Sequence, residues 1–183
     1  MVEEIVDLVS EDITPFLIHF GEIKITPEIL DVNDGSCIQI RRVPGPRLGT
    51  LLLDDSDLNK LKSIYAKLGY KVGYISKYCV EHGHLHTENV VVENDEPHII
   101  DWGQGTYFGI TYSNIEQRYR FWMEQNSEFL LRTTKERLIT ANREIYYPNL
   151  ERIYCEKFRS GLLSPLKPSS REIRDRAALI GCY

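Results

Sequence analysis

Asn89 and Asp101 are two oxygen-bearing side chains that flank a pair of short apolar segments in EHGHLHTENVVVENDEPHIIDWGQG, residues 81–105. Amide and carboxylate oxygens are the ligands that Mg²⁺ uses where it holds the phosphates of a nucleotide. Phosphoryl transfer also needs a base or an orienting carboxylate near the acceptor. His84 lies five residues before Asn89, where such a group is expected. The spacing predicts His84 as the catalytic residue, and Asn89 and Asp101 as ligands of the metal and its nucleotide.

The imidazole of His84 limits the chemistry that this site can perform. An imidazole accepts a proton with a free pKa of about 6.5, but it brings no negative charge and is not an oxygen ligand for Mg²⁺. A role as base is compatible with histidine, whereas the charge that a carboxylate would supply is missing. Two interpretations stay open: His84 is a replacement base, or it is a histidine with a structural role in the place of a carboxylate.

Three histidines alternate in this stretch, at His82, His84 and His86. On an extended strand they would share a face, and three imidazoles can bind zinc or another transition metal. Gly83 and the surrounding turn residues favour a loop over a strand. A histidine-based transition-metal protein is therefore kept as an alternative hypothesis.

The composition fits one folded domain. The chain has 183 residues, of which 42% are hydrophobic, so it can bury a substantial core. Its formal net charge is −5 and its pI is about 5.6. This acidic balance argues against a protein that mainly grips a nucleic-acid backbone. We expect no direct nucleic-acid binding.

The cysteines indicate a reducing compartment. They are far apart and form no C-x-x-C pair, at Cys37, Cys79, Cys155 and Cys182. Such spacing favours free thiols over a disulfide scaffold or a zinc site. No apolar run approaches the roughly 20 residues that span a bilayer, and the start MVEEIVDLVSED lacks the basic and apolar regions of a signal peptide. The sequence predicts a cytoplasmic protein without a membrane partner.

The first 45 residues combine a helical pattern with a β pattern. Residues 2–20 carry apolar positions at helical spacing, and Pro15 interrupts them, which predicts one or two short helices. The segment KITPEILDVNDGSCIQIRRV alternates and is rich in β-branched residues. We predict a β-hairpin there, with its turn at Asn33 to Gly35.

The remainder of the chain is mainly helical in pattern. Apolar spacing predicts a helix that starts at a capping Ser56 or Asp57 and stops at Gly83. The strands NVVVEN and HIID form a second small hairpin around the turn ENDEP. After these strands the sequence predicts helices at residues 114–131, 134–146, 149–160 and 169–180. A small β portion before a helical body makes the fold class α+β.

Several of these stretches together resemble one known family. ITPEILDVNDGSCIQIRRVPGPRLGTLL is similar to its strand, strand and hinge segment, HGHLHTENVVV to its catalytic loop, and IIDWGQGTYF to its metal-binding loop. The final SREIRDRAALIGCY is similar to its basic tail. The family is the protein-kinase-like superfamily, in the compact branch of RIO kinases and aminoglycoside phosphotransferases. The nearest resemblance is to the small atypical kinase of the KEOPS tRNA-modification complex, over about residues 25–125.

This resemblance implies a fold and its division. Residues 1–43 would form a truncated N-terminal lobe with a short helix and a β-hairpin, and residues 44–183 a helical C-terminal lobe, in one compact unit. His82 matches the family's structural histidine, which braces the loop. The family's catalytic aspartate falls on His84. The cofactors implied are Mg²⁺ and ATP, held by Asn89 and Asp101.

The resemblance also has gaps. The roughly 40 residues before the hinge contain no glycine-rich loop and no V-A-I-K-like strand. Lys24 is too close to the hinge strands to be the usual lysine, and residues 2–12 are a candidate for the helix that would carry its glutamate partner. We therefore expect a degenerate kinase that acts as a binding or regulatory subunit with protein partners in a KEOPS-like assembly. A minimal active Mg-ATP-dependent serine/threonine kinase or ATPase is the alternative.

Overall fold

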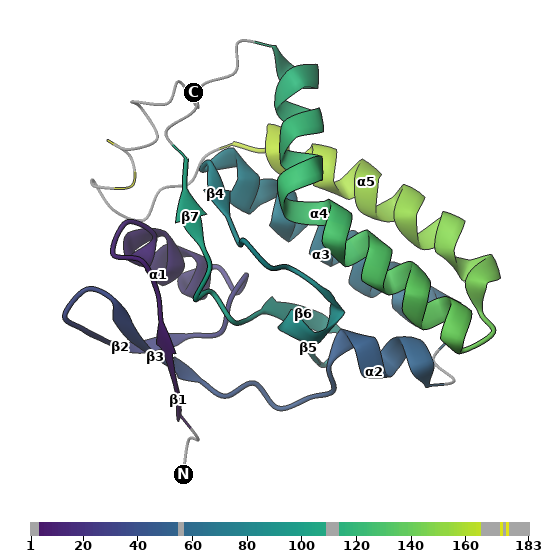
Figure 1. The fold of residues 1–183 in the computed structure, drawn as a ribbon, viewed down its shortest axis with the longest axis horizontal. Helices are drawn as coiled ribbons and strands as arrows, with labels where there is room; N and C mark the ends of the chain where they lie inside the picture. The colour runs from purple at the N-terminus through teal and green to yellow at the C-terminus, as the bar shows by residue number, and fades with distance from the viewer. Residues whose placement is uncertain (1–3, 55–56, 109–113, 166–172, 174, 176–183) are drawn as a thin grey trace.

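The computed structural model describes residues 4–54, 57–108, 114–165, 173 and 175. Its architecture is mixed α+β, as the sequence predicts, with a small sheet beside a larger helical body (Figure 1). The strands are β1 (Glu4–Leu8), β2 (Ile29–Asn33), β3 (Cys37–Arg41), β4 (Val80–Glu81), β5 (Val90–Glu93), β6 (Glu96–Ile99) and β7 (Thr106–Tyr107). The helices are α1 (Thr14–Glu22), α2 (Leu48–Leu53), α3 (Leu58–Lys77), α4 (Ile115–Thr140) and α5 (Tyr147–Leu163), with 3₁₀ turns η1 (Thr87–Asn89) and η2 (Glu144–Tyr146).

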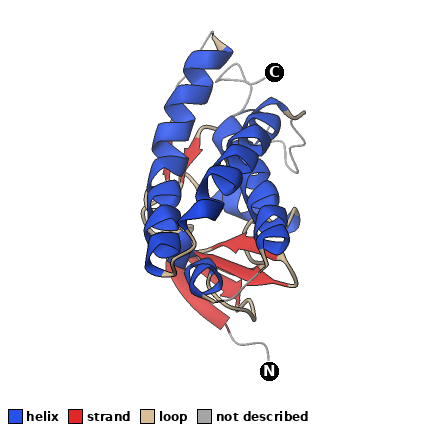
Figure 2. Ribbon diagram, turned by 90° about the vertical axis from the view of Figure 1, so that its right-hand side faces the viewer, coloured by secondary structure: helices blue, strands red, loops and turns tan. Residues whose placement is uncertain are grey.

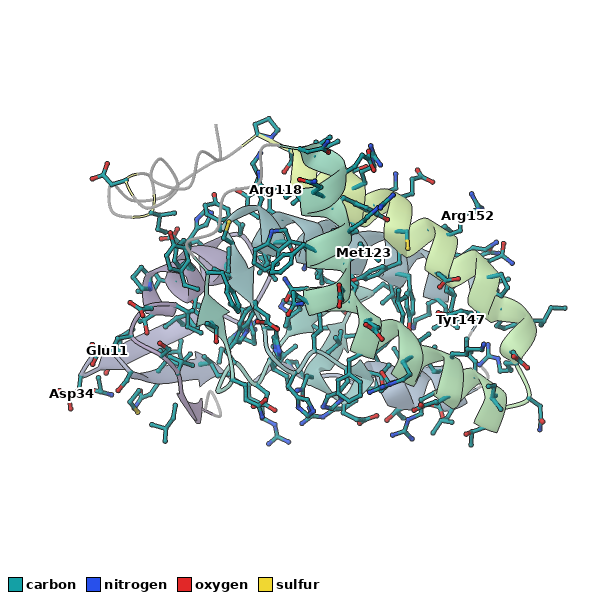
Figure 3. The ribbon with its side chains drawn as sticks, turned by 45° about the horizontal axis from the view of Figure 1, so that its top comes forward. Glu11, Asp34, Arg118, Met123, Tyr147 and Arg152 are labelled. Atoms are coloured by element: carbon teal, nitrogen blue, oxygen red, sulfur yellow. The ribbon has the colours of Figure 1, made fainter. Side chains whose placement is uncertain are left out.

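The N-terminal sheet has the order β1-β3-β2, and all its neighbours are antiparallel. Figure 2 shows most strands gathered toward one end of the molecule, with the long helices beyond them. The predicted hairpin is confirmed, since β2 and β3 flank a turn in which Asp34 and Gly35 have φ of 53° and 72°. The Thr14 hydroxyl donates to the Gly35 carbonyl at 2.6 Å, and Glu11 lies beside Asp34 at this tip (Figure 3). The start of α1 thus anchors the turn.

The helical prediction for residues 2–20 is wrong at its beginning. Glu4–Leu8 is the strand β1, which pairs with β3 in unbroken register. β-Branched Ile5 and Val6 suit a strand, and hydrogen bonding to β3 outweighs the helical spacing of the apolar residues. Residues 4–8 are therefore no counterpart of the helix proposed for 2–12. Pro15 stands in the first turn of α1, where its missing N–H costs nothing.

The two helices predicted at 114–131 and 134–146 are joined in one continuous helix, α4, which ends at Thr140, so that residues 141–146 form a turn and η2 instead. No glycine or proline lies in this segment, and Asn114 caps its start by accepting from the backbone N–H groups of Glu116 and Gln117. The predicted helix at 149–160 is confirmed as α5, α2 is unpredicted, and the helix predicted at 169–180 lies mostly outside the described residues. None of the described helices is both long and apolar enough to cross a membrane.

The helix predicted to stop at Gly83 ends earlier, at Lys77. Its start agrees with the prediction, with Asp57 at the N-cap position. Cys79 has a left-handed backbone, with φ of 57°, which breaks the helix and lets the chain enter β4. Residues 78–83, which the sequence predicts to be helical, therefore form a turn, the strand β4 and the start of a loop.

Glycines allow α3 and α5 to lie directly against each other. A Cβ atom on Gly73 would approach the Phe158 carbonyl oxygen to 2.0 Å, and one on Gly161 would approach the Tyr70 carbonyl oxygen to 2.1 Å. Both obstacles are backbone atoms, so a side chain there would force the helices apart. This contact is the most extensive between elements of the described chain.

Residues on both sides of the predicted boundary between residues 43 and 44 share one hydrophobic cluster. Ile38 and Ile40 of β3 and Phe16 of α1 are buried in the same cluster as Tyr65 and Tyr78 of the helical body. The sequence predicts a hairpin and a short helix for residues 1–43, and the structure adds the strand β1 to them. The small sheet is thus packed onto the body through α1.

Gly73→Ala tests the α3–α5 contact. We expect the variant to lose about 1–3 kcal/mol of unfolding free energy, because overpacking against a backbone oxygen outweighs the better helix propensity of alanine. Urea denaturation of both proteins measures this difference. Ser63→Ala on the exposed face of α3 is the control and should change stability by less than about 0.5 kcal/mol. Equal stability of Gly73→Ala and the wild type would contradict the packing described.

Candidate functional site

The β5–β6 hairpin brings Asn89 and Asp101 to the same end of a ladder. Val90 pairs with Ile99, and the Ile100 N–H donates to the Asn89 carbonyl oxygen at 3.0 Å. Asn89 therefore lies opposite Ile100, and Asp101 is the next residue along the chain. The two predicted metal ligands are twelve residues apart in the sequence, and the hairpin brings their backbones to the same end of the ladder.

Asn89 is buried and its side chain is oriented by the loop before it. Its Nδ2 donates to the His84 carbonyl oxygen at 3.0 Å, and its backbone N–H donates to the His86 carbonyl oxygen at 3.0 Å. Since the amide nitrogen is engaged by the loop, Oδ1 is the atom that a cation would bind. This hydrogen bond joins Asn89, a predicted metal ligand, to the backbone of His84, the predicted catalytic residue.

Asp101 is exposed and has a left-handed backbone, with φ of 64°. This conformation is uncommon for residues other than glycine and needs support from its surroundings. The support comes from both neighbours. The Ile100 carbonyl oxygen lies 2.8 Å from Nε2 of His82, and the buried Trp102 donates through Nε1 to the Ile99 carbonyl oxygen at 3.2 Å. The carboxylate of Asp101 is presented to solvent from a fixed backbone.

His82 is a buried structural histidine. A carbonyl only accepts, so Nε2 carries the proton toward Ile100, and Nδ1 faces the His84 N–H at 3.4 Å. Its ring lies 4.6 Å from the Trp102 ring, centroid to centroid. The backbone N–H of His82 donates to Oδ1 of Asn126 at 3.0 Å. Burial lowers its pKa from 6.5 to about 4. His82 braces the loop as a neutral group and is not free to exchange protons with a ligand.

His84 is exposed and its ring belongs to an aromatic cluster that the sequence did not reveal. Its ring centroid lies 4.6 Å from that of His86 and 5.1 Å from that of Phe129 on α4. Arg132 lies over the Phe129 ring at 4.8 Å. Phe129 and Arg132 stand one turn apart on the same helix face, but nothing in their spacing indicates that this face meets the loop. The predicted base therefore packs on another imidazole and a phenyl ring.

The remaining charges near the loop are paired with each other. The Glu88 carboxylate meets the Arg137 guanidinium at 3.2 Å, and the Glu88 carbonyl accepts from Arg47. Burial lowers the pKa of His86, and the neighbouring His84 and Arg47 lower it further. Glu88 is thus held by arginines, which leaves Asp101 as the carboxylate available to a metal among the residues described for this loop.

The three alternating histidines do not form a metal site. Nδ1 of His86 accepts from the Glu88 N–H at 3.2 Å, and both ring nitrogens of His82 face backbone groups. Among the described residues, no three or more histidine, cysteine, aspartate or glutamate side chains are grouped closely enough to hold a metal ion. The loop conformation, with Gly83 at φ of 80°, separates what a strand would have aligned. The transition-metal hypothesis has no support in this geometry.

Lysine and arginine hold the far end of the hairpin. The buried Lys71 meets the Glu96 carboxylate at 2.5 Å and donates to the carbonyl oxygens of Lys24 and Pro97. Arg41 of β3 pairs with Glu93 of β5 at 3.5 Å. Lys24 contributes its backbone to this joint and stays exposed. These contacts fix the hairpin between the sheet and the helical body.

Comparison with known proteins gives one partial similarity to report. No family model matches the chain. A probable bifunctional tRNA threonylcarbamoyladenosine biosynthesis protein of Methanosphaera stadtmanae is 31% identical over 84 residues. The match covers 45% of this chain and spans only 15% of the relative's length. It is compatible with the predicted link to tRNA modification, while the kinase-like superfamily and the roles of His84, Asn89 and Asp101 stay predictions.

Gly83→Ala tests the contact between the two loops. A Cβ there would lie 2.2 Å from the Gln104 carbonyl oxygen, on a backbone with φ of 80°. We expect a loss of about 2–4 kcal/mol of unfolding free energy, because strain and a clash add. Gly35→Ala is the matched control, since it has similar φ but no contact under 3.5 Å, and it should cost about 1 kcal/mol. Equal losses in urea denaturation would contradict a tight contact at Gln104.

His82 should make the protein less stable in acid. Its pKa in the folded chain, about 4, is below the ordinary 6.5, so between these values the unfolded chain binds more protons. The stabilisation is complete above pH 6.5 and is lost as the pH falls toward 4, by up to about 3 kcal/mol. Urea denaturation across this range should show the decline, and His82→Gln should flatten it.

Three further histidines limit how flat that profile becomes. Burial also lowers the pKa of His19, His86 and His98, so part of the slope will remain in His82→Gln. Ser63→Ala, which changes an exposed residue of α3 and removes no titratable group, is the control and should keep the wild-type slope. A His82→Gln profile as steep as that of the wild type would be inconsistent with a buried neutral imidazole.

Proposed function

We propose that this chain is a kinase-like protein that has lost, or nearly lost, phosphoryl transfer and acts as a binding or regulatory subunit. Its assembly would be of the kind that synthesises threonylcarbamoyladenosine in tRNA. The observation that carries the proposal is the environment of His84. An exposed imidazole, packed against His86 and Phe129, occupies the position where the sequence predicts the catalytic carboxylate.

The charges around the loop support the loss of catalysis. A magnesium-bound triphosphate needs several anionic or oxygen ligands to balance the metal and to orient the acceptor. Glu88 is committed to Arg137, so Asp101 and the amide oxygen of Asn89 are the described ligands left for Mg²⁺. Weak metal binding follows from this reduced set. The scaffold that holds the loops is nevertheless intact, which suits a protein whose role is to bind a partner.

The relative supports the choice of assembly. The relative is named as a probable bifunctional protein of tRNA threonylcarbamoyladenosine biosynthesis. The region that matches this chain is 15% of its length. The region that matches this chain therefore belongs to a protein of threonylcarbamoyladenosine biosynthesis, which is the link between this chain and that reaction. We therefore infer a protein partner from the same modification reaction. Co-elution of the purified chain with the tRNA threonylcarbamoyladenosine biosynthesis protein on a sizing column is the direct test.

An active Mg-ATP-dependent kinase or ATPase is the second candidate, favoured by one observation. The ladder places Asn89 opposite Ile100, next to Asp101, and Asn89 is oriented by the His84 carbonyl. That arrangement would hold a magnesium ion if its affinity sufficed. Under this candidate, ATP is hydrolysed or transferred, and Asp101→Ala abolishes the turnover.

Thermal unfolding with and without Mg-ATP separates the two candidates. We expect the wild type to shift by less than about 1 °C, because occupancy of the site stays low. A ligand present at about one hundred times its dissociation constant would stabilise by about 2.7 kcal/mol, which is a shift of several degrees. A shift of that size in the wild type that is absent in Asp101→Asn would overturn the loss of nucleotide binding.

His84→Asp is the matched variant for the same measurement. It introduces a carboxylate at position 84, whose backbone carbonyl accepts from the Asn89 amide. We expect it to shift further with Mg-ATP than the wild type does, by several degrees if binding becomes saturated. An unchanged response would mean that the rest of the site, and not the charge at position 84, prevents binding.

A further inference from the structure

Three aromatic rings from two separate parts of the chain form one cluster at the protein surface. His84 and His86 lie in the loop before η1, and Phe129 lies on α4. The ring centroid of His84 is 4.6 Å from that of His86 and 5.1 Å from that of Phe129. The centroids of His86 and Phe129 are 5.4 Å apart. His84 is exposed while the other two residues are half-buried, so His84 is the ring that a ligand meets first.

Two exposed arginines at this cluster form no ion pair among the described residues. The Arg132 guanidinium lies over the Phe129 ring at 4.8 Å. Arg47 precedes α2 and donates to the backbone carbonyl of Glu88, in the same loop as the two histidines. The Glu88 carboxylate is paired with Arg137 instead. The cluster therefore combines flat rings with two positive charges that are available to a ligand.

Aromatic rings beside arginines have the properties of a site for single-stranded nucleic acid. Every nucleobase has flat faces that stack on an aromatic ring, and the phosphates between the bases attract arginine. Bases in a duplex are already stacked on their neighbours, so a surface ring binds unpaired bases. The net charge of −5, which argues against a grip on a nucleic-acid backbone, describes the whole chain. Stacking depends only on a few rings and the charges nearest to them.

We propose that the cluster binds single-stranded RNA, with one base stacked on the His84 ring and neighbouring phosphates bound by Arg132 and Arg47. This inference rests on the proposed function, because an assembly that modifies tRNA makes RNA the nucleic acid at hand. Stacking requires a ring and no negative charge at position 84. The imidazole that lacks the charge of a catalytic carboxylate is therefore well suited to hold a base. The loop contributes to the assembly by holding an unpaired segment of its RNA.

Fluorescence anisotropy of a labelled octa-adenylate RNA measures this binding, with the full chain and without Mg²⁺ or ATP. An abasic RNA of the same length keeps the phosphates and lacks the bases, and it should bind about tenfold more weakly. The slope of log K against log salt concentration should be about −1.4, because each of two phosphate contacts contributes about −0.7. Equal affinity for the two RNAs, or no binding of octa-adenylate at about 1 mM protein, would refute the proposal.

Variants separate the contribution of the ring from that of the charge. His84→Ala should weaken the binding of octa-adenylate about tenfold, and His84→Phe, which keeps a ring, should restore it. Arg132→Gln should weaken binding about fivefold and reduce the salt slope to about −0.7. Arg152→Gln removes the same charge from the exposed side of α5 (Figure 3) and is the matched control, with unchanged affinity. A His84→Ala protein that binds as tightly as the wild type would contradict stacking on this ring.

RNA binding and the Mg-ATP response can fail separately. Asp101→Asn, which decides the nucleotide response, should bind octa-adenylate at least as tightly as the wild type, because it loses a negative charge. A wild type that responds to Mg-ATP and binds RNA through His84 would overturn only the loss of nucleotide binding. Absence of both responses would overturn only the RNA site. Displacement of the RNA by an equal concentration of an octaglutamate peptide would identify a general anion surface and overturn the assignment to RNA.

Discussion

The register of the β5–β6 ladder is the constraint on which the candidate site depends. Because Val90 pairs with Ile99, Asn89 and Ile100 share a hydrogen bond and Asp101 follows beside them. A slip of one residue would turn every side chain of a strand to the opposite face. The register is held at its far end by Lys71, whose buried amino group bonds to Glu96 and to the Pro97 carbonyl. Contacts from α3 at one end of the hairpin, together with the pairing of β5 with β6, thus fix a single register.

The backbone of Asp101 shows how the same scaffold supports an unfavourable conformation. Its left-handed φ is fixed because His82 bonds to the residue before it and Trp102 is buried after it. His82 must remain neutral to serve this role, and its burial ensures that it does.

Geometry and electrostatics lead to different conclusions at this site. The hairpin brings the predicted metal ligands Asn89 and Asp101 to the same end of one ladder, yet the predicted base is an exposed imidazole and Glu88 is paired with Arg137. Positions that backbone pairing fixes do not depend on any one side-chain charge, whereas the charge balance of a site does. Under the proposed function, this combination favours binding over phosphoryl transfer.

The sequence by itself determined the elements whose signals are local. The turn at Asp34 and Gly35, the two hairpins, α3 and α5 follow from β-branched alternation, turn residues and helical spacing, each of which acts within a few positions. Only the tertiary structure decided the state of Glu4–Leu8, because helical and extended patterns coincide there and pairing with β3, more than 30 residues away, selects the strand. It also decided the surroundings of His84. Phe129 and Arg132 lie on α4, 45 and 48 residues after His84, and their spacing indicates a shared helix face but not what that face contacts.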